Sequence, residues 1–317
     1  MKSTKQWCNA KCIGVMGKIR NTLKKSKPLI AVYQKFIKIR SKIRLLYMKL
    51  FAKVLTEDDL IAQFPDLGLN PGDVIVVNSS MTKIGLLENG PATIVNALKR
   101  YVGPDGLIVM PAYPHRGMYE YLENVKLFDV RQTPSKNGAI TEYFRKSEGV
   151  VRSAHPTHSV AAWGKDAEKI VAGHENCKTP YAKGSPYDKL INMGAKNFLI
   201  GVNFDHMILF RAFDDLGQNN KINTYVPNKI YHVPVKLANG REIMVDTPCH
   251  DPQFFSAERW NMRLFPYMKE YITFGHLGSA ETWVLDSKEM FRIQQECADN
   301  DIYPFYHYRF KQEYEQV

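Results

Sequence analysis

The sequence has few cysteines, no long apolar run and no acidic residue before Glu57. Its five cysteines are scattered and odd in number, which argues against a disulfide framework, and Cys8 and Cys12 lack the spacing of a zinc-binding pair. No run approaches the ~18 apolar residues that span a bilayer, and no small-residue cleavage site indicates a signal peptide. We therefore expect a cytoplasmic protein without a metal site.

The positive charge is concentrated near the N-terminus. The 317-residue chain has a formal charge of +11, but residues 1–53 hold twelve lysines and three arginines, so the remainder carries −4. Pro28 precedes a series of apolar residues spaced three or four apart among these basic residues, namely Leu29, Val32, Phe36, Ile39, Ile43, Leu46 and Leu50. This spacing predicts a basic amphipathic helix in an N-terminal extension, residues 1–56.

Three roles remain open for this extension. The helix could dock on the rest of the chain or on another subunit of a homo-oligomer. It could instead attach residues 1–53 to an anionic membrane, which would make the protein peripheral at the inner membrane face. We favour nucleic-acid binding least, because the basic residues come without a recognition motif.

Residues 57–317 predict a single α/β domain. Residues 74–77 and 107–110 are short apolar runs typical of buried strands, and residues 91–101 between them have helical spacing. This strand–helix–strand order predicts a parallel pair, and residues 197–202 predict a further buried strand. We expect three layers around a largely parallel central sheet.

The pattern changes after Asn223. Residues 230–237 and 242–245 flank an Asn239-Gly240 turn and predict an antiparallel hairpin. Because no internal repeat or linker interrupts the chain after residue 57, we expect one domain rather than two.

The densest group of chemically active side chains lies in residues 152–159. Pro156 separates His155 from His158 and predicts a stiff loop rather than a helix. Imidazole titrates near neutral pH and is the most frequent general base in enzymes. A histidine beside a strand is more often a hydrogen-bonded structural residue, so the segment by itself leaves both roles open.

Together with seven further motifs, this segment resembles the aminoglycoside 3-N-acetyltransferase family. The resemblance covers about residues 57–290 and implies transfer of an acetyl or similar acyl group from acyl-CoA to the amine of an amino sugar. The acceptor would be an aminoglycoside or a nucleotide-linked sugar of surface-polysaccharide biosynthesis, and we favour the second. The seven motifs are residues 72–80, Gly85, Gly90-Pro91, and residues 102–111, 133–135, 184–186 and 199–202.

The resemblance places the acyl-CoA site after the first strand. Ligands of open α/β sheets gather beyond the carboxyl ends of strands, and backbone amides at a helix start can hold phosphate. Asn78, Ser79, Ser80, Gly85 and Gly90 are the expected contacts. Relatives carry a histidine at the position of Asn78, and an asparagine can donate a hydrogen bond but cannot take up a proton.

The proton released by the amine needs an acceptor. His155 is our first candidate, because the His-Pro pair is the more regular part of the family pattern, and His158 is the second. Relatives also show an acidic residue after a strand like that at residues 199–202, and Asp205 matches it.

Counted from Asp205, the next histidine of the family pattern falls on Arg211 and the later acid on Asp214. An arginine stays protonated and cannot serve as the base. Either another residue such as His206 takes the proton, or the amine arrives poised to lose it. Arg211 would suit an anionic acceptor, or it could simply pair with Asp214 or Asp215.

The residues at positions 78 and 211 keep a non-catalytic alternative open. Asn78 and Arg211 both stand where relatives carry an ionisable imidazole. A protein that lacks both imidazoles could be a membrane-associated binding or scaffold relative. Binding of coenzyme A distinguishes the enzyme from the scaffold.

Overall fold

The computed structural model describes residues 53–218, 220–252 and 263–304. The chain divides into two units, Met1–Lys53 and Val54–Val317, and the second unit holds the α/β body. The expected amphipathic helix falls outside the described residues, so its role stays a prediction. Among the helices that are described, none is long and apolar enough to cross a membrane.

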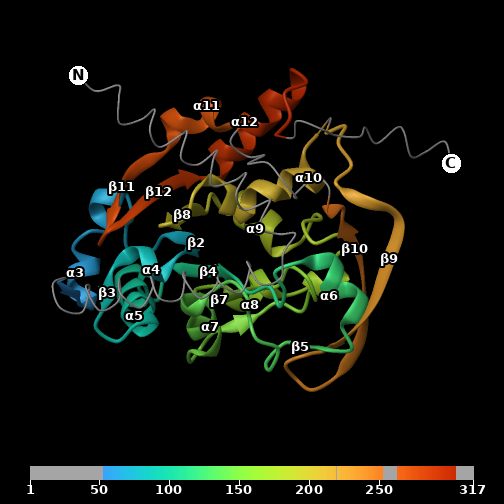
Figure 1. Ribbon diagram of the computed structural model, residues 1–317, viewed down its shortest axis with the longest axis horizontal. Coiled ribbons are helices and arrows are strands. Elements are labelled where there is room, and N and C mark those ends of the chain that lie inside the picture. Colours follow the sequence, from blue (N-terminus) through green and yellow to red (C-terminus); the bar gives the residue numbers. More distant parts are fainter. Residues whose placement is uncertain (1–52, 219, 253–262, 305–317) are drawn as a thin grey trace, which may run out of the picture. The chain divides into compact units, whose positions relative to one another are not determined.

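A seven-stranded mixed sheet forms the centre of the body (Figure 1). Only the three central strands β8, β2 and β4 run parallel, and the four outer pairings are antiparallel. In spatial order the strands are β11 (Thr273–Leu277), β12 (Ala280–Asp286), β8 (Lys196–Ile200), β2 (Val74–Ser79), β4 (Leu107–Pro111), β7 (Val160–Gly164) and β6 (Val151–Arg152).

The expectation of a largely parallel sheet is therefore wrong for its flanks. Only Gly278 and Ser279 join β11 to β12, and only residues 153–159 join β6 to β7. A parallel crossover needs about a dozen residues or more, so these short connections force β11 to pair antiparallel with β12, and β6 with β7. The antiparallel start of β7 lies beside the end of β4, with Val160 opposite Pro111.

The predicted strand–helix–strand unit is confirmed. Helix α5 (Pro91–Val102) connects β2 to β4, and the two strands pair in parallel with Ile75 opposite Ile108. Pro91 occupies the first turn of the helix, where its missing amide costs nothing. Gly103 follows the helix with φ of 74°, a conformation that favours glycine.

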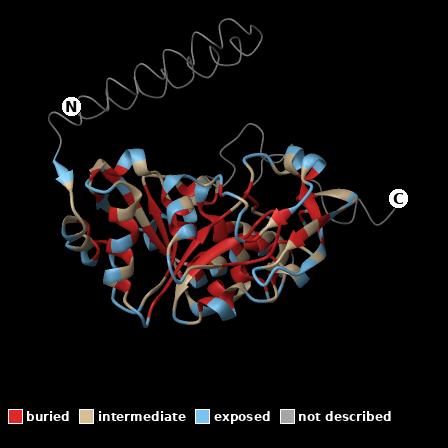
Figure 2. Ribbon diagram, turned by 90° about the horizontal axis from the view of Figure 1, so that it is seen from below, coloured by how far each residue is buried: buried red, intermediate tan, exposed pale blue. Residues whose placement is uncertain are grey.

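Two apolar cores on opposite faces of the sheet confirm the three layers. Val76 of β2 belongs to one core and its neighbour Ile75 to the other, as strand alternation requires. Figure 2 shows the buried strands between helices whose outer faces are exposed. Helices α8 (Ala167–Val171), α9 (Pro186–Met193) and α12 (Ser287–Asp299) contribute to the first core, and α3 (Glu57–Ile61), α5 and α7 (Ala139–Lys146) to the second.

The predicted hairpin is also confirmed. Strands β9 (Tyr225–Lys236) and β10 (Glu242–His250) pair antiparallel, and β5 (Phe128–Asp129) adds a third strand in parallel with β9. Both long strands extend beyond the predicted runs, to Tyr225 and His250, which pair at the far end of the hairpin. These two residues reach the site described below.

The remaining elements are short. Strands β1 (Val54–Leu55) and β3 (Leu86–Leu87) form a separate parallel pair. The described cysteines, Cys177, Cys249 and Cys297, are buried free thiols. Short α-helices are α4 (Met81–Ile84), α6 (Met118–Asn124), α10 (Phe213–Leu216) and α11 (Phe265–Met268), and 3-10 helices are η1 (Pro65–Leu67), η2 (His174–Asn176), η3 (Phe204–His206), η4 (Ile208–Ala212) and η7 (Lys269–Tyr271).

Candidate active site

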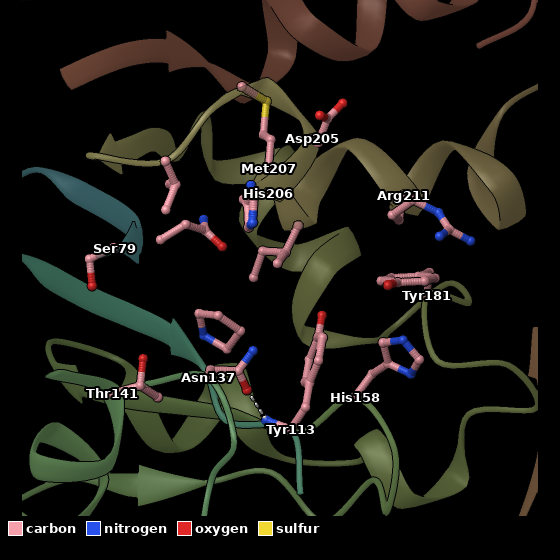
Figure 3. Close-up of a pocket in the computed structure, with 14 residues that line it drawn as sticks. Ser79, Tyr113, Asn137, Thr141, His158, Tyr181, Asp205, His206, Met207 and Arg211 are labelled. Atoms are coloured by element: carbon pink, nitrogen blue, oxygen red, sulfur yellow. Dashed lines mark hydrogen bonds between the residues drawn. The ribbon is translucent and has the colours of Figure 1, made fainter. Parts of the chain in front are cut away.

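A cavity of about 270 Å³ lies at the carboxyl ends of the parallel strands β2, β4 and β8 (Figure 3). This is the position at which open α/β sheets bind ligands. In the view of Figure 3, Ser79 and Thr141 lie on one side and His158, Tyr181 and Arg211 on the other. The cavity is lined by Asn78, Ser79, Pro111, Tyr113, Asn137, Thr141, His158, Tyr181, Val202, Asp205, His206, Met207, Ile208 and Arg211.

Six of the residues expected from the sequence therefore meet in one cavity: Asn78, Ser79, His158, Asp205, His206 and Arg211. Five others do not line it: Ser80, Gly85, Gly90, His155 and Asp214. The glycine loop turns elsewhere, since a side chain at Gly85 would meet Leu55 and Ser279. The cavity thus gives no support to phosphate binding by this loop, which stays a prediction.

The segment of residues 152–159 is held rigidly at the cavity wall. Ser153 and Val160 exchange hydrogen bonds, from Ser153 N to Val160 O and from Val160 N to Ser153 Oγ, each 2.9 Å long. The Ser159 hydroxyl donates to Ala112 O at 2.8 Å. Because β7 is antiparallel to β4, this preceding loop lies where β4 ends, which brings His158 to the cavity.

Helix α9 fixes the same segment from the other side. Ser185 caps the helix by accepting from Asp188 N at 3.3 Å, and Pro186 follows in the first turn. The helix places Tyr187, which is fully buried, so that its hydroxyl donates to His158 O at 2.8 Å. The Gly-Ser-Pro motif thus positions a residue that holds the histidine segment.

His155, the first candidate for the base, is buried behind the cavity. Its ring stacks on His174 with centroids 4.7 Å apart. His174 has a structural role, since its Nε2 donates to Pro180 O at 2.9 Å and its Nδ1 accepts from the Ser153 hydroxyl. Burial, assisted by His174, lowers the pKa of His155 well below the usual imidazole value. The geometry favours His158 over His155 as the residue that meets substrate.

His158 packs within a cluster of aromatic and imidazole rings at the cavity wall. The centroids of Tyr113, Tyr181 and His250 lie 4.7, 5.1 and 5.3 Å from its own. Burial lowers the pKa of His158 well below its usual range, and His250 opposes a positive charge further. The ring is therefore neutral at neutral pH, as a general base must be.

Arg211 forms a largely shielded ion pair with Asp214. Its Nε and Nη2 atoms lie 2.9 and 2.8 Å from Asp214 Oδ2, and the two side chains are 13% and 9% exposed. Burial works against the charged guanidinium, but the Asp214 carboxylate outweighs it and holds the pKa of Arg211 above its usual value. The structure thus shows the pairing with Asp214 that the sequence left open, and the positive charge in the cavity is compensated.

A second cavity, of about 480 Å³, is lined by both Asp214 and Asp215. Asp215 accepts hydrogen bonds from Tyr181 N at 3.2 Å and from the Tyr225 hydroxyl at 2.9 Å. Burial raises the pKa of Asp215 to about 6. Because Arg211 lines the first cavity and its partner Asp214 the second, the ion pair contributes to the walls of both.

Comparison of the sequence with known protein families identifies the family of this chain. The family model described as Aminoglycoside 3-N-acetyltransferase matches residues 76–298. The chain belongs to the aminoglycoside 3-N-acetyltransferase family. The resemblance inferred from the motifs is thereby confirmed.

Individual aminoglycoside 3-N-acetyltransferases agree with this assignment. Aminoglycoside N(3)-acetyltransferase III of Acinetobacter baumannii is 30% identical over 190 residues, 55% of this chain and 64% of the relative's own length. The type IV enzyme of a Salmonella species is 30% identical over 207 residues, 64% of this chain and 73% of the relative. Two solved structures, AAC-IIIb with CoASH and AAC-VIa bound to sisomicin, each have a TM-score of 0.68 at 25% identity. Each covers 79% of this chain, and the match spans 98% and 99% of those structures.

Asn78, at the position where the resemblance predicts a histidine, carries a buried amide donor at the edge of the cavity. The side chain lines the cavity and is 6% exposed, and its Nδ2 atom has no hydrogen-bond partner among the described residues. A buried amide without a partner costs free energy, which makes it a candidate for ligand contact. The atom is suited to a carbonyl oxygen that gains negative charge during acyl transfer.

Several residues at or near the cavity are not predicted by any sequence motif. Tyr113, Tyr181 and His250 come from segments far apart in the chain, and no local pattern marks them. Thr157 lies within the histidine segment and could have been noticed as a hydroxyl between two imidazoles. Among the described residues, no group of three His, Cys, Asp or Glu side chains is arranged to hold a metal ion.

Proposed function

We propose that this protein transfers an acetyl or similar acyl group from acyl-CoA to the amine of an amino sugar. The observation that carries the proposal is the cavity at the ends of β2, β4 and β8, which joins a neutral imidazole, His158, to a free amide donor, Asn78. Membership of the family and the similarity to a structure that holds CoASH support coenzyme A as the acyl carrier.

The reaction needs three things from the protein. The acceptor nitrogen must be neutral when it attacks the thioester carbonyl, the oxyanion must be stabilised, and the released proton must be taken up. A new C–N bond forms, the C–S bond breaks, and the proton leaves with the coenzyme A thiol. Asn78 is proposed to donate its Nδ2–H to the oxyanion.

The charges near the cavity bear on the acceptor. Arg211 suggested an anionic, nucleotide-linked sugar, but Asp214 compensates its charge and Asp215 lies in the adjoining cavity. A pyrophosphate gains less from a paired guanidinium than from an uncompensated one. The reason for favouring a nucleotide-linked sugar is therefore weaker, and we propose an acceptor that carries ammonium groups, as aminoglycosides do.

Thiol release from acetyl-CoA tests the proposal. The purified full chain is incubated with a panel of aminoglycosides and a panel of nucleotide-linked amino sugars, and free thiol is measured against acceptor-free controls. Release with aminoglycosides and not with nucleotide-linked sugars is the expected result. Release with nucleotide-linked sugars alone would instead favour surface-polysaccharide biosynthesis. No release with any acceptor, with no coenzyme A binding in calorimetry, would support the scaffold alternative.

We further propose that the basic extension attaches the protein to anionic membranes in the cytoplasm. Each lysine or arginine near such a surface contributes on the order of 1 kcal/mol, and salt screens the attraction. The full chain is expected to sediment with anionic vesicles at low salt and to be released at high salt. Deletion of residues 1–53 should abolish sedimentation while leaving the body folded. Equal sedimentation of the two proteins would contradict attachment through the extension.

A further inference from the structure

The hydroxyl of Thr157 lies between two imidazoles. Its Oγ1 atom is 2.9 Å from Nδ1 of His158 and 3.2 Å from Nδ1 of His155. All three side chains are buried. A hydroxyl carries one hydrogen and can donate to only one of these nitrogens, so the pair of contacts restricts where the ring protons lie.

The contacts of His155 determine which atom donates in each of these two hydrogen bonds. The backbone N–H groups of Thr157 and His158 both point to Nδ1 of His155, each at 3.4 Å. An amide N–H can only donate, so Nδ1 of His155 is an acceptor and carries no hydrogen. With its pKa well below the usual imidazole value, His155 is neutral, and the two amide donors place its proton on Nε2. That atom is buried and has no acceptor among the described residues, which is a cost of this tautomer.

The tautomer of His158 follows. If the Thr157 hydroxyl donated to His158, its lone pair would face the lone pair on His155 Nδ1 at 3.2 Å, which is repulsive. If it donates to His155, both contacts are hydrogen bonds, and His158 Nδ1–H donates to Thr157 Oγ1. The proton of the neutral His158 ring is then on Nδ1, and Nε2 carries the lone pair.

That lone pair is available to the cavity. His158 lines the cavity, and no hydrogen bond from a described residue reaches its Nε2 atom. His206 also lines the cavity, but its side chain is exposed and it is held only by Asn203 at 2.7 Å. Arg211 stays protonated and cannot accept a proton.

We propose that Nε2 of His158 is the general base of the acyl transfer and that Thr157 and His155 are positioning residues that fix its tautomer. The proposal rests on the proposed function. Nε2 takes one proton from the acceptor amine as the C–N bond forms. The imidazolium then returns this proton to the coenzyme A sulfur as the C–S bond breaks, so no proton accumulates on the protein.

The surroundings of His158 affect its two proton transfers in opposite directions. The ring is faced by His115 and Tyr113 from the segment after β4, His250 from β10, Tyr181 from the loop before α9, Arg211 from η4, and His155. Burial and the neighbouring histidines and Arg211 disfavour a charged ring, which lowers its pKa. The neutral ring is therefore a weaker base for the amine proton, and the imidazolium is a stronger acid for the departing thiolate.

Side-chain ¹⁵N NMR of the full chain reads the tautomers without any need for turnover. We expect His158 protonated at Nδ1 and His155 at Nε2, with signals assigned by His158→Gln and His155→Gln. In Thr157→Val, which removes the hydroxyl and keeps the shape, His158 should lose its preference for Nδ1. A wild-type His158 protonated at Nε2 would overturn the positioning role of Thr157 and His155.

Kinetics test the catalytic role. His158→Gln should lower kcat by roughly 10²- to 10⁴-fold and leave the Kd of coenzyme A unchanged. Thr157→Val should lower kcat by roughly three- to tenfold, the factor expected for loss of one neutral hydrogen bond, and Thr157→Ser should restore it. His276→Gln, at an exposed histidine on β11, is the matched control and should have no effect.

The pH profile adds a readout that a structural role would not give. Wild-type kcat/KM should fall on the acidic side only as the acceptor amine becomes protonated, because the lowered pKa keeps His158 neutral to well below pH 6.5. In His158→Gln the rate should keep rising above the amine pKa, because hydroxide must then replace the lost base. Turnover at the wild-type rate in His158→Gln, or a larger loss of turnover in His206→Gln, would overturn the assignment of His158 as the general base. Either result would leave the proposed function intact. Absence of turnover with every acceptor would overturn the proposed function together with the catalytic role, even if the tautomers are as expected.

Discussion

Replacing Arg211 with methionine is expected to lower the free energy of unfolding by about 3–5 kcal/mol. The guanidinium and the Asp214 carboxylate are both largely shielded from solvent, and the two contacts between them are 2.8 and 2.9 Å long. Methionine keeps much of the arginine's length but leaves the carboxylate without its positive partner in a poorly solvated place. Urea denaturation of the wild type and the variant, followed by circular dichroism, measures the difference.

The double variant Arg211→Met with Asp214→Asn is the control. It removes both charges together, so no buried charge is left uncompensated, and most of the lost stability should return. Asp214→Asn alone should also be destabilising, because it removes the carboxylate that balances the guanidinium charge. A single Arg211→Met variant as stable as the wild type would contradict a structural role for the ion pair and would favour a role in substrate binding instead.

The sequence predicts the centre of this fold better than its edges. The β2–α5–β4 unit follows from local signals, namely two short apolar runs and a helical repeat that begins at Pro91 and ends before Gly103. The direction of β11 relative to β12, and of β6 relative to β7, depends on the length of the loop that joins each pair. The expected parallel direction was wrong for these strands because it was taken from the fold class and not from the lengths of the loops.

The site shows the same division. His155, Thr157 and His158 are neighbours in the sequence, so the segment itself was predictable, but which imidazole meets substrate depends on the start of β7 beside β4. His250 and Tyr181 approach His158 from other parts of the chain, and neither these contacts nor the lowering of the His158 pKa by His250 has a sequence signature. The sequence could predict the pairing of Arg211 with Asp214, because the two residues are three apart. The structure shows this pairing, which the sequence had left open beside pairing with Asp215 or binding of an anionic acceptor.

Arg211 and Asn78, the two positions at which the sequence resemblance predicts a histidine, have different surroundings in the structure. Arg211 forms an ion pair with Asp214, and its guanidinium cannot act as a base. Asn78 leaves a buried donor without a partner at the end of β2. Together with His158 this donor would supply what acyl transfer requires, a base for the amine proton and a hydrogen bond for the oxyanion.

Asn78→Leu is expected to lower kcat by roughly 10²- to 10³-fold, the usual cost of removing one oxyanion donor. Leucine has nearly the same shape but no N–H, and the oxyanion exists only during the reaction, so the Kd of coenzyme A should change little. Stability should not fall, because the Asn78 Nδ2 atom has no partner among the described residues and its removal leaves no broken hydrogen bond. Single-turnover kinetics and urea denaturation, run on the same preparations, measure both quantities.

Asn78→His separates a lost donor from a disturbed cavity. A histidine at this position can present an N–H to the same oxygen, so this variant should recover part of the lost rate while Asn78→Leu does not. A structural role predicts the opposite order, because the larger imidazole disturbs a buried strand end more than leucine does. Equal rates for the wild type and Asn78→Leu would show that the oxyanion finds its hydrogen bond elsewhere, and the donor role of Asn78 would then be abandoned.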